Sequence, residues 1–79
     1  MTNTPLPEQS ARIKELHSLY HFREIAIDAN GIGHGLADEL VLPQWDRKGR
    51  YWEPLYVSND PETYPYPREE KDKAIIYNI

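Results

Sequence analysis

The 79-residue sequence contains no cysteine, and this absence excludes two ways of stabilising a small domain. No disulfide can form, and no zinc site built on thiolates is possible. Hydrophobic residues make up only 39% of the chain, so the core that such a length allows must be thin. The sequence therefore predicts one small domain that is held together by packing alone.

Long apolar runs and a positive net charge are also missing. No segment approaches the ~18 consecutive apolar residues of a membrane span, and the first ten residues lack the apolar centre of a secretion signal. These two absences predict no membrane association and a cytoplasmic location. The formal net charge is -4, whereas a protein that binds nucleic acid by itself normally carries a basic surface.

The first half of the chain alternates between helical and extended patterns. A helix is predicted over residues 7–20, where prolines begin the segment and apolar side chains recur at spacings of three and four. Residues 23–28 are apolar on both faces, which favours a central parallel strand covered on both sides. A second helix is predicted over residues 33–41, before Pro43. The helix–strand–helix order over residues 7–41 indicates an α/β fold.

Residues 42–79 form a less regular segment. The turn signal around Gly49 fits a β-hairpin and an irregular loop equally well. Short strands are predicted near residues 55–58 and 74–78, and the proline-rich, charged stretch between them should be an exposed, largely irregular loop. In the helix predicted over residues 7–20, the apolar stripe consists of Ile13, Leu16 and Tyr20. The side chains that we expect to be most buried are Ile13, Leu16, Phe22, Ile25, Ile27, Leu36, Leu40, Val57 and Ile75.

The stretch IAIDANGIGHGLADEL, residues 25–40, places an acid at the end of an apolar strand and glycines at alternate positions after it. Asp28 lies where α/β sheets bind ligands, and its oxygens suit Mg²⁺ or Mn²⁺. A phosphate-binding turn is the weaker interpretation, because the ribose-binding acid and the phosphate-loop lysine are both missing. Capping of the following turn by the Asp28 side chain explains its position as well as metal binding does.

This stretch resembles the region around the second acidic residue in the nuclease domain of tailed-phage terminase large subunits. The resemblance covers most of the chain and is sharpest over residues 22–41; the segments VSNDPETY and AIIYNI resemble later strands of that domain. The whole sixteen-residue pattern is moderately specific, whereas the Gly-x-Gly alone is not. The matching positions are Ile25, Ile27, Asp28, Asn30, Gly31, Gly33, Gly35, Leu36, Asp38 and Leu40.

The resemblance implies a ribonuclease-H-like fold and a metal-dependent endonuclease that cuts concatemeric viral DNA during genome packaging. Such an enzyme holds two Mg²⁺ or Mn²⁺ ions between three acids, and only Asp28 maps onto one of them, as catalytic residue and metal ligand. The first acid would precede the matching region, the third would follow Ile79, and the ATPase domain is missing. The resemblance therefore implies that residues 1–79 form a single partial domain, inactive alone, in the host cytoplasm.

The partners implied are the remaining terminase segments, or a second copy joined through exposed strand edges, with double-stranded DNA bound only by the complete assembly. The alternative is a small non-catalytic α/β module, derived from such a domain, that binds a protein partner.

Two other patterns have a functional and a simpler interpretation. His17 and His21 have the i, i+4 spacing of a zinc-binding pair, but no third ligand is evident, and surface histidines are the more common explanation. The aromatic residues could stack on bases, but their acidic, proline-rich setting favours partner contact or minor core burial. These aromatic residues are Trp45, Tyr51, Trp52, Tyr56, Tyr64 and Tyr66.

Overall fold

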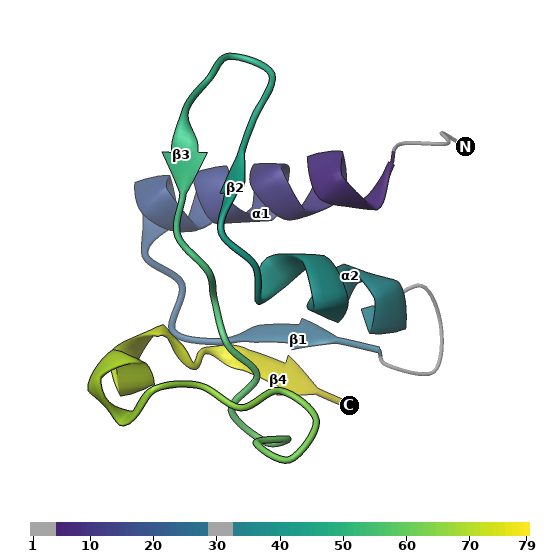
Figure 1. Cartoon of the computed structure of the whole chain (residues 1–79), viewed down its shortest axis with the longest axis vertical. Helices are drawn as coiled ribbons and strands as arrows, with labels where there is room; N and C mark the ends of the chain where they lie inside the picture. Colours follow the sequence, from purple (N-terminus) through teal and green to yellow (C-terminus); the bar gives the residue numbers. More distant parts are fainter. Residues whose placement is uncertain (1–4, 29–32) are drawn as a thin grey trace.

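The computed structural model describes residues 5–28 and 33–79, and for residues 33 and 34 it describes the backbone only. The predicted helix–strand–helix order is confirmed, and the turn around Gly49 forms a hairpin, one of the two alternatives that its sequence allowed. Within the described residues, the chain is a small mixed α/β domain (Figure 1). Its elements are α1 (Leu6–Tyr20), β1 (Ile25–Ile27), α2 (Gly33–Leu40), β2 (Gln44–Trp45), β3 (Tyr51–Trp52), the 3₁₀ helix η1 (Arg68–Lys73) and β4 (Ile76–Asn78).

The main sheet is built around β4. β1 runs parallel to β4, with Ile25 opposite Ile76. On the other side of β4, Val57 forms an isolated parallel bridge to Ile76. In place of the strand predicted over residues 55–58, the structure has this single bridge. Among the described residues, β4 is paired on both sides and β1 on one, so the prediction that residues 23–28 form the central strand is wrong.

The two faces of the sheet differ in cover. Ile27 points toward α2 and is buried, whereas Ala26 and Tyr77, which alternate onto the opposite face, are exposed. The prediction of a strand covered on both sides is therefore also wrong. The physical reason is that Ala26 is too small for its exposure to cost much, so an apolar residue on the second face does not require a second layer.

The hydrophobic core lies between α2 and the sheet. The predictions for Ile27, Leu40 and Val57 are confirmed, and Ile13, Ile25, Leu36 and Ile75 pack against the core while half-buried. Its buried members are Ile27, Ala37, Leu40, Leu55, Val57, Tyr64 and Ile76.

Helix α1 buries a different stripe from the predicted one. Its buried residues are Ser10, Ala11 and Lys14, whereas Leu16 is half-buried and Tyr20 is exposed. The polar members of this stripe are paired: the Ser10 hydroxyl donates to Gln44 Oε1 at 2.6 Å, and Lys14 Nζ donates to the Leu42 carbonyl at 2.6 Å. These hydrogen bonds to the segment after α2 satisfy the polar side chains on the inward face of α1.

Helices α1 and α2 approach closely at Gly35. A Cβ atom added there would lie 2.7 Å from Leu6 Cδ1. Glycine at this position thus serves the contact between the two helices.

The proline-rich stretch is more regular than predicted. η1 has no buried residue, as predicted, but Tyr64 in the same stretch is buried in the core, and Arg68–Lys73 is helical where we expected irregular chain. Pro67 precedes this helix, and its restricted backbone favours a helical first turn directly after it. No helix in the described ranges is long and apolar enough to cross a membrane.

Candidate functional site

Asp28 directly follows β1, as predicted, and it is exposed. The parallel pairing of β1 with β4 brings the carboxyl ends of both strands to the same edge of the sheet (Figure 1). Ile27 lies opposite Asn78, so Asp28 is one residue beyond the last paired position. This edge is where side chains of an α/β sheet meet a ligand.

Two asparagines complete the same edge. The Asn59 side chain binds the Asn78 backbone twice: Asn59 Nδ2 donates to the Asn78 carbonyl at 2.7 Å, and the Asn78 N–H donates to Asn59 Oδ1 at 2.9 Å. The Asn59 amide thus takes the place of a peptide group in a neighbouring strand. The Asn78 side-chain oxygen Oδ1 is buried and has no hydrogen-bond partner, which is uncommon for a buried polar atom.

Two side chains at this edge carry oxygen atoms of a type that divalent metal ions accept. Asp28 offers carboxylate oxygens and Asn78 Oδ1 is an unpartnered amide oxygen; both are donor types that Mg²⁺ and Mn²⁺ accept. Within residues 5–28 and 33–79, however, no three His, Cys, Asp or Glu side chains gather as a metal cluster. Asp28, Asn59 and Asn78 lie at the same edge of the sheet.

The remaining motif residues have varied positions. Asn30 and Gly31 lie outside the described residues. Asp38 accepts a hydrogen bond from the Tyr64 hydroxyl at 2.9 Å. Burial raises the pKa of Tyr64 to about 12, and the hydrogen bond to Asp38 adds to the rise. Asp38 therefore has a structural partner, Tyr64. The Tyr64 side chain is buried in the core, which is one of the two expectations for the aromatic residues.

The histidine pair ends a helix. His21 has left-handed backbone geometry (φ 53°) at the C-terminal cap of α1, and its N–H donates to the His17 carbonyl at 2.7 Å. The Phe22 N–H donates to His17 Nδ1 at 3.1 Å. Burial and the neighbouring His21 lower the pKa of His17. Since His17 Nδ1 accepts a backbone hydrogen bond, the pair is explained by helix capping.

Sequence reasoning missed Asn59 and Asn78. The alternation of AIIYNI could have placed Asn78 on the face of Ile76, at the end of the strand. Pairing with Asn59 depends on a contact between segments 19 residues apart, which no local pattern indicates. No family model, curated protein or solved structure matches this chain, so its function is inferred from the site and from the resemblance of its sequence.

Proposed function

We propose that this chain contributes Asp28 as a metal ligand to a ribonuclease-H-like, metal-dependent endonuclease of the terminase large-subunit type. In this proposal other segments supply the remaining acids, and the complete assembly cuts concatemeric viral DNA during packaging. The observation that carries the proposal is the exposed carboxylate at the carboxyl end of β1, beside the end of a parallel neighbour. Two-metal hydrolysis requires carboxylates at such an edge, because the ions must contact both protein oxygens and the scissile phosphate.

The described residues alone should not form a competent site. Mg²⁺ prefers six oxygen ligands at near-octahedral geometry, and a single carboxylate leaves most positions to water. The isolated chain should therefore bind the ion weakly and should not cut DNA.

Manganese titration followed by NMR tests the assignment of Asp28. Paramagnetic Mn²⁺ at millimolar concentration should broaden the amide signals of Ile27, Asp28 and Asn78 first. Asp28→Asn keeps the shape and removes the charge, so it should abolish this broadening. Asp72→Asn, on exposed η1, is the matched control and should leave it unchanged.

A cleavage assay extends the test to the complete assembly. Products of neighbouring reading frames that carry the missing acids should restore Mg²⁺- or Mn²⁺-dependent cutting of plasmid DNA, and Asp28→Asn should abolish it. Cutting that survives Asp28→Asn would contradict the assignment, as would cutting by the purified chain alone.

A non-catalytic interaction module is the second candidate, and the edge of β1 favours it. Ile25 and Ile27 direct their backbone groups toward β4, as the hydrogen bonds from Ile25 N–H to Ile75 and from Ile79 N–H to Ile27 show. Ala26 therefore directs its backbone groups away from β4, toward a side where no other described strand pairs with β1. A strand from a partner could extend the sheet there.

A further inference from the structure

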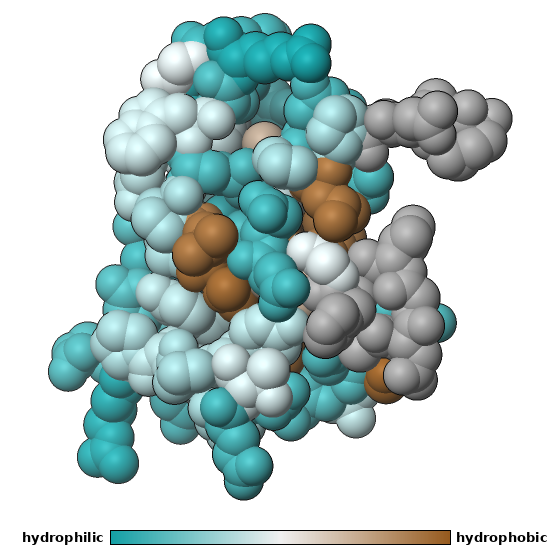
Figure 2. Space-filling model, turned by 45° about the vertical axis from the view of Figure 1, so that its right-hand side comes forward, coloured by the Kyte–Doolittle hydropathy of each residue, from teal (hydrophilic) through white to brown (hydrophobic). Residues whose placement is uncertain are grey.

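A cleft between α1 and the β2–β3 hairpin lies on a different part of the molecule from Asp28. Its volume is about 440 Å³. The hairpin stands against the side of α1, and its loop reaches past the helix (Figure 1). The end of the molecule that carries this loop is covered by hydrophilic side chains (Figure 2).

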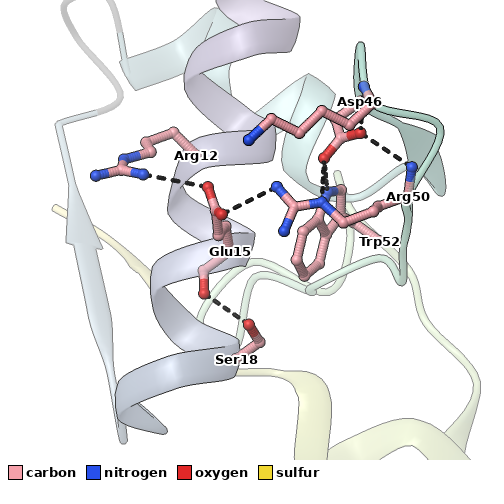
Figure 3. A network of polar contacts seen from close by, with 7 residues as sticks. Arg12, Glu15, Ser18, Asp46, Arg50 and Trp52 are labelled. Carbon is pink, nitrogen blue, oxygen red and sulfur yellow. Dashed lines mark hydrogen bonds and ion pairs between the residues drawn. The ribbon is translucent and has the colours of Figure 1, made fainter.

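The hairpin is attached to α1 along its length. At its base, Gln44 accepts from Ser10 and donates through Nε2 to the Pro7 carbonyl at 3.0 Å. Farther along, Arg50 Nη2 lies 2.9 Å from Glu15 Oε2, a contact that Figure 3 shows from close by. Attachment at both levels makes the cleft a preformed site.

Asp46 holds the hairpin loop together through hydrogen bonds and an ion pair within the hairpin. Its carboxylate accepts hydrogen bonds from the backbone N–H of Lys48 and Arg50 and from the Trp52 indole (2.8–3.0 Å), and Arg50 Nε lies 3.0 Å from Oδ2 (Figure 3). Burial alone would raise the pKa of Asp46, but these donors together outweigh it and lower the pKa to about 2. The acid is therefore charged at neutral pH and is fully engaged with the hairpin.

The charges of the cleft are arranged in layers. The acidic side chains Glu8, Glu15 and Asp46 are 14–34% exposed, whereas the arginine side chains that pair with them are 45–85% exposed. Lys48 is also exposed, and its ammonium forms no ion pair with another described residue. A ligand approaching the cleft meets cations first. The basic residues that line it are Arg12, Arg47, Lys48 and Arg50.

This layering runs against the charge of the whole chain. Four of the nine lysines and arginines line the cleft, together with three of the thirteen acids, which leaves five cations and ten acids elsewhere. A polyanion is therefore repelled by most of the surface and attracted here.

An exposed aromatic pair adjoins the cations. Trp45, which lines the cleft, is 67% exposed, and its ring centroid lies 4.8 Å from that of Tyr51 on the opposite strand. Tyr51 supports one side of Trp45 while much of the indole surface stays in water. Exposed aromatic surface beside outward-facing cations is the combination that binds single-stranded nucleic acid, because bases stack on the rings and phosphates pair with the cations.

We propose that this cleft binds a single-stranded nucleic acid, with a base stacked on Trp45 and phosphates held by Arg12, Arg47 and Lys48. The proposal goes beyond the metal site, because it requires neither Asp28 nor a divalent ion. Three phosphate contacts on a small protein predict weak, salt-dependent binding.

Fluorescence anisotropy of a labelled decathymidylate, in EDTA and at low salt, tests this proposal on the full chain. Trp45→Ala should weaken binding by at least fivefold, the lower limit for losing one stacked base, while Tyr20→Ala, an exposed aromatic on α1, should not. Lys48→Glu should weaken binding by at least fivefold, and Lys71→Glu, the same charge change on exposed η1, should have a clearly smaller effect.

Three further measurements complete the test, and the second of them separates this proposal from the previous one. Circular dichroism should show that all four variants are folded, and Asp28→Asn should bind the oligonucleotide as the wild type does. The log–log dependence of affinity on salt should have a slope of about -2, as expected for three phosphate contacts to a single strand. The proposal would be overturned if Lys48→Glu and Lys71→Glu had equal effects. It would also be overturned if duplex DNA bound equally well and without dependence on Trp45, or if no binding were detected at about 20 mM salt, where charge screening is weak.

Discussion

At the scale of single residues, Lys14 is the least expected feature of the fold. It lies on the inward face of α1 at 3% exposure, with the Leu42 carbonyl as hydrogen-bond partner at 2.6 Å. Burial lowers its pKa to about 8, and the charge of Glu39 opposes this shift only in part. A lysine in this position penalises the folded state whenever the amine carries its proton.

The pH dependence of stability should reveal this penalty. Between pH 8 and 10.5 the unfolded chain holds the Lys14 proton while the folded chain has released it, so stability contributed by this residue rises with pH. The rise should be on the order of 2–3 kcal/mol, since one pKa unit corresponds to about 1.4 kcal/mol.

Urea denaturation at pH 7.5, 9 and 10.5 measures this effect, with Lys14→Met as the comparison because the tyrosines also titrate in this range. The difference in free energy of unfolding between the two proteins should change in favour of the wild type as pH rises. A constant difference would show that Lys14 keeps an ordinary pKa in the fold.

At the scale of elements, the α1–α2 contact depends on Gly35. Glycine is a poor helix former, and valine is slightly better, so intrinsic propensity would favour Gly35→Val. The added side chain would meet Leu6, whose Cδ1 atom already occupies the space of a Cβ. Leu6 Cδ1 ends a flexible side chain and can shift, but the two γ-methyls of valine add further volume at the same contact, so packing should outweigh propensity.

We expect Gly35→Val to lower the free energy of unfolding by about 1–3 kcal/mol, the usual cost of overpacking. Leu6→Ala should recover much of this loss when it is combined with Gly35→Val, giving a coupling of about 1 kcal/mol in a double-mutant cycle. Chemical denaturation of the four proteins measures the cycle. Strictly additive effects would place the cost outside the contact between the two helices.

The elements themselves follow from local patterns, and their arrangement does not. The helix over residues 7–20 and the strand ending at Asp28 are indicated by apolar spacing and by prolines, so their existence and approximate ends could be predicted. The central position of β4 depends on its pairing with two segments distant in sequence, β1 and Val57. Periodicity reports how a residue alternates between faces, but it carries no information about which strands become neighbours.

The candidate sites show the same limit. Asp28 could be identified because a strand end is a local property. The cleft could not, since Glu8 and Glu15 lie seven residues apart on α1 while their partners Arg47 and Arg50 come from the hairpin. Only the docking of the hairpin on α1 brings these charges together.

At the scale of the whole molecule, the interaction-module proposal depends on the outer edge of β1. Ala26 presents its N–H and carbonyl away from β4, and its side chain is exposed. If the interaction-module candidate is right, the sheet grows by adding a strand here, from a second copy or from another protein.

Sedimentation velocity over a range of concentrations tests self-association through this edge. Ala26→Pro removes the outward N–H and leaves the hydrogen bonds of Ile25 and Ile27 to β4 in place, so it should abolish any dimer that the wild type forms. Tyr77→Ser, on the exposed face of the sheet, is the control and should leave the dimer intact. A dimer that persists in Ala26→Pro would exclude this edge as the interface.

The buried position of Lys14 has a consequence for its chemical labelling. Near pH 8 about half of its amines are uncharged in the folded chain, yet the residue is only 3% exposed and lines a small cavity beside residues 52–55, so an acylating reagent in solution reaches it poorly. When α1 moves away from the segment that follows α2, the amine is exposed, but its pKa returns toward the ordinary value and most of it becomes protonated. The labelling rate of this one lysine therefore reports the fraction of time that the domain is open, and not each opening event.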